Sequence, residues 1–295
     1  MSFFTQLLIN GIVVGSVYGV AAMGFVLIYK SSRVINFAQG DLLALGAFIC
    51  YALIVSFKIP FIPALLITCA ISFCLGLVLE RIILRPMIGE SPISIIMLTI
   101  GLASMIKGVI YFFWGAGDLA YPMFVTQKPI IIGSIYISPI YIATLVLTAL
   151  LLGIFGFFFK HSTQGVAMRA VADDQMASQS LGVSVKRVFG VSWAIAALVA
   201  TIGGIIIALV NGLNAQALSF VGLKVFPVVI LGGLDSIMGA IIGGVIIGIL
   251  ENLAMGYLDP LVGGGLGETF PFFVLIIILM IKPYGLFGIV EIERV

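Results

Sequence analysis

The sequence predicts an all-α polytopic membrane protein with eight or nine transmembrane helices. Of its 295 residues, 62% are hydrophobic and only 9% are charged, whereas a soluble domain has about 25% charged residues. Its mean hydropathy is +1.31. The charge-free runs 1–29, 59–79 and 188–223 all reach the ~20 residues that span a bilayer. They are apolar on every face, which excludes the alternating strands of a membrane β-barrel.

Charges and turn residues divide the chain into nine candidate passes. The seventh is too short for an ordinary span, contains Pro227 and ends at Gly232 and Gly233. These features predict a broken or re-entrant segment with a hinge at the two glycines, so the count is eight or nine. The nine passes cover about 5–29, 36–57, 61–79, 92–114, 139–159, 188–210, 221–234, 236–256 and 269–284.

Basic residues favour one side of the membrane. If the loops alternate sides, one side receives Lys30, Arg33, Arg81, Arg85, Lys160, Arg169, Lys186, Arg187, Lys282 and Arg294, and the other receives Lys58, Lys128 and Lys224. The positive-inside rule then places the N-terminus outside and the C-terminus in the cytoplasm. Lys107 lies inside a pass, near its outer end, where we expect its side chain to snorkel to the interface.

This orientation predicts an inverted-topology repeat, because passes 1 to 4 run opposite to passes 6 to 9. We treat residues 1–295 as a single transmembrane domain. It comprises repeat 1 (about 5–114), a linking pass (139–159), a cytoplasmic loop (160–187) and repeat 2 (about 188–285). The sequence similarity between the repeats is faint and comprises Asn36, Ala38 and Gln39 against Asn214, Ala215 and Gln216.

Polar residues gather at the start of the second pass. Asn36, Gln39 and Asp41 surround Gly40 there, and unpaired polar groups are costly in hydrocarbon. One interpretation is a discontinuous helix whose break, at Gly40, lines a path. The other is an interfacial turn in which Asp41 caps the second pass.

Two further segments predict helix packing and a helix in the cytoplasmic loop. Gly239, Gly243, Gly244 and Gly248 form two GxxxG spacings, which predict close helix packing within the chain or between subunits. In the cytoplasmic loop, 166–181 is rich in helix formers, and Gly182 follows as a C-cap.

The predicted loop helix carries small and apolar residues near one face. They are Ala170, Ala177 and Leu181, flanked by Arg169, Asp173 and Asp174. Such a helix suits insertion into a groove on a partner protein. The alternative is a solvated connector.

Several function classes are disfavoured. The chain has no phosphate-binding GxxxxGK[ST] loop, and its net charge of +2 offers no basic stripe for nucleic acid. Its cysteines lack metal-ligand spacing, and His161 is the only histidine. We therefore expect no enzyme activity, no cofactor and no metal site.

Five segments, in order, resemble the shorter permease subunits of ABC importers for branched-chain amino acids. The segment 36–41 resembles a family NFAHG[ED] element, with Gln39 in place of histidine. The segment 80–86 resembles its ER…RP loop, 169–183 its coupling segment, and 222–233 its late short pass. The tail 282–288 resembles RPQGLFG, with Lys282 for arginine and Tyr284 for glutamine.

The resemblance implies an importer of the inner (plasma) membrane with several subunits. A second, paralogous permease, two cytoplasmic ATP-binding subunits and an extracytoplasmic substrate-binding protein would complete it. The coupling residues would be Arg169, Asp174, Ala177 and Gly182. Asn36, Gln39, Asn214 and Gln216 are our candidates for lining the substrate path.

The identity of the solute stays open at this stage. Related permeases serve branched-chain or other hydrophobic amino acids, or urea and short amides. A rival from another class is an ion-coupled secondary transporter, which needs a buried coupling site. Asp235 and Glu251 are the acidic residues that could supply it.

Overall fold

The computed structural model describes residues 2–87, 90–122, 130–132 and 135–288. Within these, seven helices are long and apolar enough to cross a membrane, and two shorter helices are also apolar. Each predicted pass corresponds to one of the nine. The long helices are α1 (Ser2–Ser32), α3 (Phe61–Leu79), α4 (Pro92–Trp114), α5 (Pro139–His161), α8 (Val185–Asn211), α9 (Ala215–Gly232) and α10 (Ile237–Tyr257), and the shorter ones are α2 (Gln39–Val55) and α12 (Leu266–Ile281).

Short elements complete the fold. A π-helical turn, η1 (Glu80–Leu84), and a 3-10 turn, η2 (Arg85–Met87), prolong α3. The connection between α5 and α8 holds α6 (Thr163–Asp173) and α7 (Gln175–Ser180), and α11 (Asp259–Val262) precedes α12. The strands β1 (Ile130–Ile132) and β2 (Ile135–Ile137) form a small antiparallel pair. The all-α prediction is confirmed apart from this pair.

The seventh pass is longer than predicted. Its helix, α9, begins at Ala215 and continues through Pro227 without a break. Asn214 caps the helix at this earlier start. The helix therefore has 18 continuous residues, and the prediction of a broken or re-entrant segment is wrong. Gly233 ends the helix with a positive φ of 101°.

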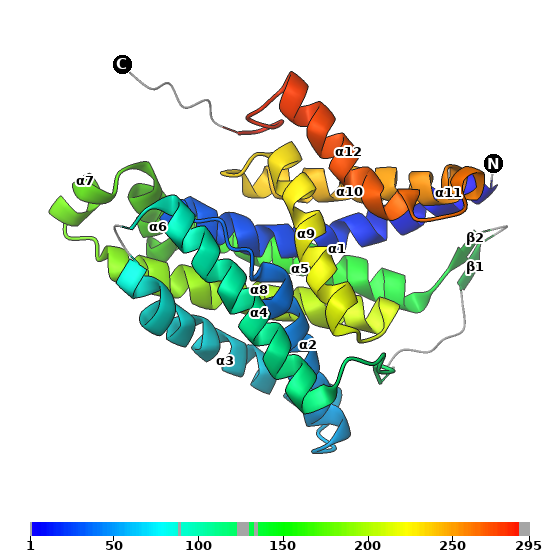
Figure 1. The fold of residues 1–295 in the computed structure, drawn as a ribbon, viewed down its shortest axis with the longest axis horizontal. Helices are drawn as coiled ribbons and strands as arrows, with labels where there is room; N and C mark the ends of the chain where they lie inside the picture. The colour runs from blue at the N-terminus through cyan, green and yellow to red at the C-terminus, as the bar shows by residue number, and fades with distance from the viewer. Residues whose placement is uncertain (1, 88–89, 123–129, 133–134, 289–295) are drawn as a thin grey trace.

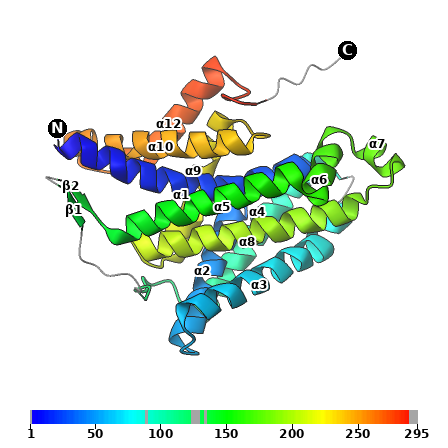
Figure 2. The ribbon, with the colours of Figure 1, turned by 180° about the vertical axis from the view of Figure 1, so that it is seen from behind.

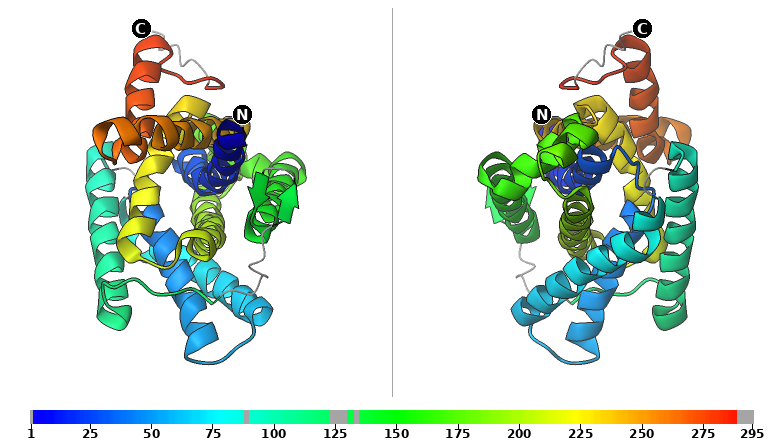
Figure 3. Two further views of the ribbon diagram at one scale, coloured as in Figure 1. Left: turned by 90° about the vertical axis from the view of Figure 1, so that its right-hand side faces the viewer. Right: turned by 90° about the vertical axis from the view of Figure 1, so that its left-hand side faces the viewer.

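The long helices α1 and α8 form the centre of the bundle, with α4 and α5 on opposite sides of them (Figure 3). In the most apolar 18-residue window of each helix, 89% of the residues of α1 and 83% of those of α8 are buried, against 22% for α4. We therefore place α1 and α8 in the protein core and α4 at its periphery. The helix α1 packs along α10, and α8 packs along α2 and α3; Figure 2 shows α1, α5 and α8 side by side.

Glycines let α1 and α10 approach closely. Gly11 and Gly15 of α1 meet Gly244 and Gly248 of α10, and a Cβ on Gly15 would lie 2.7 Å from the Cα of Val245. The predicted packing role of the GxxxG spacings is confirmed within the chain. A larger residue here would force the two backbones apart.

The two ends of the bundle differ. The N-terminal end of α1 lies beside α11, and α6 and α7 lie at the opposite end (Figure 1). At the α7 end, the turn after α12 is attached to the last turn of α9. The backbone N–H groups of Leu286 and Phe287 donate to the carbonyls of Leu231 and Gly232 at 2.8 and 3.1 Å.

Candidate functional site

The second pass begins inside the bundle. After α1 ends, residues 33–38 are non-helical, yet the side chains of Asn36 and Gln39 are each only 1% exposed. Asn36 Oδ1 accepts from the backbone N–H of Ala38 at 3.0 Å, and its Nδ2 donates to Gln39 Oε1 at 3.3 Å. Thr99 of α4 accepts from the backbone N–H of Phe37 at 3.3 Å. Side chains thus satisfy the backbone of the connection between α1 and α2. Because α2 is continuous from Gln39 onward, the predicted helix break at Gly40 is wrong.

Asp41 does not cap α2. The N-cap position is Ala38, and no side-chain hydrogen bond caps the helix. The carboxylate of Asp41 instead faces α9 and α4. Its Oδ1 accepts from the hydroxyl of Ser219 at 2.6 Å and lies 3.8 Å from Nζ of Lys107. The interfacial-turn interpretation is therefore wrong in this respect.

A line of polar side chains runs along the seam between α4 and α9. Tyr111 of α4 donates to Gln216 Oε1 at 3.3 Å, and Lys107 lies one helical turn before Tyr111. Together with Asp41 and Ser219, these residues form what we call the α4–α9 polar row. Lys107 belongs to this row and does not simply snorkel outward as predicted.

The four predicted path residues fall into two groups. Asn36 and Gln39 lie together behind the row, and the amide nitrogen of Gln39 is buried without a hydrogen-bond partner. Asn214 and Gln216 lie at the start of α9, where Asn214 accepts from the N–H of Ala217 at 2.9 Å and donates to Asp118. In the part of the chain that the structure describes, no hydrogen bond joins the two groups.

A second intramembrane ion pair joins two different helices, so no local sequence pattern indicates it. Lys224 of α9 contacts Glu251 of α10, with Nζ and Oε1 2.6 Å apart. The two side chains are 9% and 3% exposed. The sequence analysis places Lys224 in a loop on the outer side, but it lies inside α9. Without Lys224, the bias of basic residues toward the cytoplasmic side becomes stronger.

Gly40 lies in the first turn of α2 and causes no break there. A Cβ on Gly40 would overlap the carbonyl of Ser219 and lie 2.8 Å from the Cα of Gly222. The absence of a side chain therefore lets α2 begin directly against α9. Gly232 and Gly233 mark the end of α9, and Gly232 packs against Gly239 of α10.

The predicted loop helix is two helices. Asp174 separates α6 from α7 and caps α7, since its Oδ1 accepts from the N–H of Ala177 at 2.9 Å. Gly182 follows with φ of +86°, as expected of a C-cap glycine. Arg169 lies on α6, which packs against α1, α5 and α8.

Three apolar side chains are uncovered on α7 and at its C-cap. Met176 is 83% exposed and Leu181 is 84% exposed, with Ala177 exposed between them. Ser178 points inward and is 3% exposed. The element thus presents a small apolar tip that projects from the end of the bundle (Figure 1).

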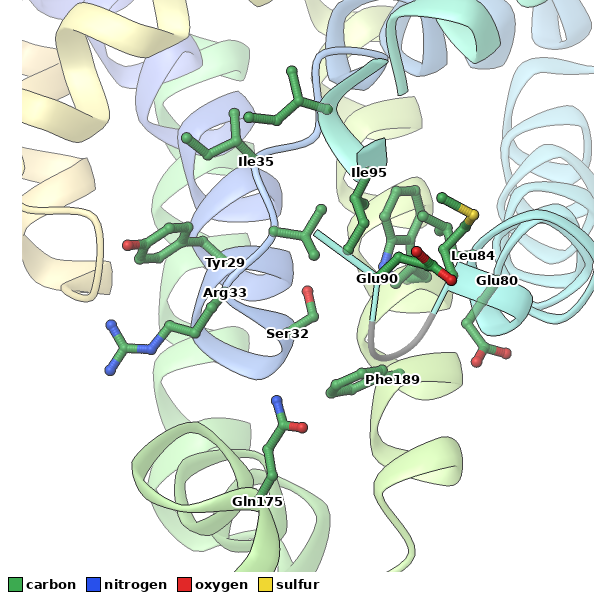
Figure 4. Close-up of a pocket in the computed structure, with 14 residues that line it drawn as sticks. Tyr29, Ser32, Arg33, Ile35, Glu80, Leu84, Glu90, Ile95, Gln175 and Phe189 are labelled. Atoms are coloured by element: carbon green, nitrogen blue, oxygen red, sulfur yellow. The ribbon is translucent and has the colours of Figure 1, made fainter. Parts of the chain in front are cut away.

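Two cavities open near this end. One of about 370 Å³ is lined by α1, η1, α4, α7 and α8, and in Figure 4 the hydroxyl of Ser32 and the amide of Gln175 point into it. Glu80, at its edge, is held by Arg85 at 2.8 and 3.2 Å. The other cavity, of about 300 Å³, includes Arg33 and Asp235, which form an ion pair of 3.4 Å.

No group of three or more histidine, cysteine, aspartate or glutamate residues that could hold a metal ion occurs among the described residues. The three cysteines are free. The features described above are polar side chains, four ion pairs and an exposed short helix.

The chain matches a family model described as "Branched-chain amino acid transport system / permease component" over residues 7–281. The permease protein LivH of Salmonella typhimurium, named for a high-affinity branched-chain amino acid transport system, is 27% identical over 310 residues, which cover 99% of this chain and 98% of the relative. BraD of Pseudomonas aeruginosa is 26% identical over 305 residues, with the same coverage.

A probable branched-chain amino acid transport permease, LivH of Methanocaldococcus jannaschii, is 28% identical over 300 residues, which cover 96% of this chain and 92% of the relative. Among solved structures, PsaBC from Streptococcus pneumoniae in complex with Fab has a TM-score of 0.52. It is 15% identical and covers 96% of this chain and 93% of that one. This likeness concerns the fold alone.

Proposed function

Because the chain belongs to the family of permease components of branched-chain amino acid transport systems, we propose that it is the membrane-spanning subunit of an ATP-driven importer. Its solutes are branched-chain or other hydrophobic amino acids, as the names of its relatives indicate. ATP hydrolysis occurs on partner subunits. The alternating-access movement of the helices then releases the solute inward.

The proposed route of the solute through the membrane rests on the α4–α9 polar row. The outward faces of α3 and α5 carry apolar and small residues, as lipid requires. On α4 and α9, by contrast, the side chain of Lys107 is 29% exposed and Gln216 is exposed. Hydrocarbon cannot solvate an ammonium group cheaply. This face therefore turns toward a water-filled route and a second, paralogous permease chain.

The four predicted path residues take different places along this route. Gln216 faces the row directly, and Asn214 holds the outer start of α9. Asn36 and Gln39 are buried in this structure, each 1% exposed. We propose that they reach the route when the start of α2 withdraws from α1 and α8 during transport, with Gly40, Gly232 and Gly233 at the moving helix ends.

The apolar tip of α7 supports the proposal for energy coupling. Met176, Ala177 and Leu181 are exposed at the end of the bundle opposite the start of α1. A short helix of this kind fits a hydrophobic groove on a cytoplasmic ATP-binding subunit. Two such subunits serve the permease pair, with Arg169, Asp174 and Gly182 shaping the contact on this chain.

The basic residues support the orientation. Lys30 and Lys160 lie in the last turns of α1 and α5, Lys186 lies in the first turn of α8, and Arg33 directly follows α1. These helix ends lie near α6 and α7 (Figures 1 and 2). By the positive-inside rule this end faces the cytoplasm. The N-terminus is then outside the inner (plasma) membrane, where a substrate-binding protein delivers the solute.

Helix packing also supports an inverted repeat. The first helix of each half packs along the third helix of the other: α1 along α10, and α8 along α3. The second helices, α2 and α9, pack together, and each also contacts the fourth helix of its own half, α4 or α12. We propose repeat 1 as 5–114 and repeat 2 as 188–285, joined by α5 and the α6–α7 connection.

Reconstitution tests this function. The chain is purified with its partner permease, ATP-binding subunits and binding protein, placed in proteoliposomes and supplied with labelled leucine. Uptake is expected with ATP and absent with a non-hydrolysable analogue. Urea or acetamide uptake in place of leucine would contradict the assigned solute. Leucine transport by the chain alone, without ATP, would contradict the importer assignment.

A further inference from the structure

We propose that Asp41 and Lys107 form a binding site for the two charged groups of a zwitterionic amino acid as it passes through the membrane. The ammonium group of the solute would contact Asp41, and its carboxylate would contact Lys107. The inference rests on the proposed import function and adds to it the residues that recognise the class of solute.

The two intramembrane ion pairs differ in their geometry. Lys224 and Glu251 are 2.6 Å apart and nearly fully buried, which is the arrangement of a closed structural pair. Lys107 and Asp41 are 3.8 Å apart, and the lysine side chain is 29% exposed. This distance exceeds the 2.7–2.9 Å of a charge-assisted hydrogen bond. The pair is thus loose and open on one side.

Each partner has capacity for a further contact. Among the described residues, the ammonium of Lys107 has the contact with Asp41 and no hydrogen bond. The contacts of the Asp41 side chain, from Ser219 and Lys107, both fall on Oδ1. A Lys ammonium has three donors and a carboxylate about four acceptor positions. An entering zwitterion can therefore replace the loose Lys107–Asp41 pair with two closer ion pairs, one between its ammonium group and Asp41 and one between its carboxylate and Lys107.

The position of the pair suits a transported solute. Asp41 is held at the head of α2 by Ser219 of α9, and Lys107 projects from α4, which packs against α2 and contacts α9. Three helices therefore meet at the two charges. Tyr111 and Gln216 continue the polar surface from there.

The chemistry favours a zwitterion over a neutral amide. Urea and short amides need hydrogen-bonding groups but no full charges. A buried acid beside a base costs desolvation energy, which a ligand bearing both opposite charges can offset. The pair therefore points to an α-amino acid with intact amino and carboxyl groups.

The test uses the permease–ATPase complex without the binding protein, in a background where Cys69 and Cys74 are alanine and the buried Cys50 is kept. In this background, which keeps Lys107 and Asp41, Tyr111→Cys lies one helical turn from Lys107 and is labelled with a methanethiosulfonate reagent. Leucine should slow the labelling about tenfold once its concentration exceeds its dissociation constant tenfold. Isoamylamine, which lacks the carboxylate, and 4-methylpentanoate, which lacks the amine, should not slow it.

A matched control lies on the same helix. Ser91 is exposed at the start of α4, about four helical turns before Lys107, and labelling of Ser91→Cys should be unaffected by leucine. Adding Asp41→Asn or Lys107→Gln to Tyr111→Cys should abolish the protection. In transport assays of the complete importer, Lys107→Gln should lower leucine uptake about tenfold while Lys107→Arg retains most of it, since the arginine keeps the charge.

The outcomes separate the two proposals. A wild-type complex that shows no ATP-dependent leucine uptake contradicts the proposed function. A working importer in which leucine leaves Tyr111→Cys labelling unchanged, or in which isoamylamine protects equally well, overturns this inference alone. Loss of uptake in Lys107→Gln while leucine still protects Tyr111→Cys in the same variant assigns the pair a purely structural role and also overturns it.

Discussion

Gly40 and Gly222 meet directly, with no side chain between them, where α2 begins against the middle of α9. A Cβ on either residue would overlap the backbone of the other helix. This contact sets the depth at which Asp41 reaches Ser219. The position of the Asp41 carboxylate thus depends on both Gly40 and Gly222 lacking a side chain.

We expect Gly222→Ala to destabilise the protein by about 1–3 kcal/mol, because added volume in a packed core forces the backbones apart. Thermal unfolding of the purified protein in detergent measures the effect. Gly101→Ala is the control, since nothing lies within 4 Å of the added Cβ there. Equal melting temperatures for the two variants would contradict the close contact.

Glu251→Ala should destabilise the bundle by about 3–5 kcal/mol, because it leaves the buried ammonium of Lys224 without its partner. The double variant Glu251→Leu, Lys224→Leu should recover most of the loss, since it removes both charges. The exposed Lys186→Leu should have little effect. Unfolding in a denaturing detergent series measures all four proteins.

Ala177→Glu should leave membrane insertion and ATP hydrolysis intact and lower leucine uptake about tenfold, within the usual range of coupling energies. The carboxylate would enter the apolar tip that we propose contacts the ATP-binding subunit. Gln179→Glu, on an already polar exposed position of α7, is the control. The ratio of leucine transported to ATP hydrolysed is the readout, and an unchanged ratio would make α6 and α7 a mere connector.

A cysteine at Gln179 should react with a membrane-impermeant maleimide only in inside-out vesicles. Gln179 is exposed, whereas the neighbouring Ser178 is 3% exposed and would report poorly. A cysteine replacing the exposed Lys58, at the other end of the bundle, should show the opposite sidedness. Reaction of Gln179→Cys from the outside of cells would reverse the topology and remove the proposed contact with the ATP-binding subunits.

The passes could be predicted because membrane hydropathy depends on runs of neighbouring residues. Eight of the nine helices follow those runs closely. The exception, α9, begins among the polar residues Asn214 and Gln216, where composition alone indicates a loop. Asn214 changes the outcome by accepting from the N–H of Ala217, and Asn is a favoured N-cap residue. An earlier start of α9 is therefore a feature that the local sequence around Asn214 indicates.

The site was less predictable, since its contacts join residues far apart in the chain. Asp41 and Ser219 were each visible as polar residues, but nothing in their local sequence pairs them. Lys224 and Glu251 likewise belong to separate helices. The break at Asp174 could have been recognised, because an aspartate followed by a short polar helix is a typical N-cap pattern.

The short turn after α12 has a practical consequence. Leu286 and Phe287 hold the inner end of α9 through backbone hydrogen bonds. We therefore expect an affinity tag or fluorescent fusion at the carboxyl end to disturb the helix that carries Ser219. Laboratories that express this chain should place such additions ahead of Ser2, where the first helix starts far from that anchor.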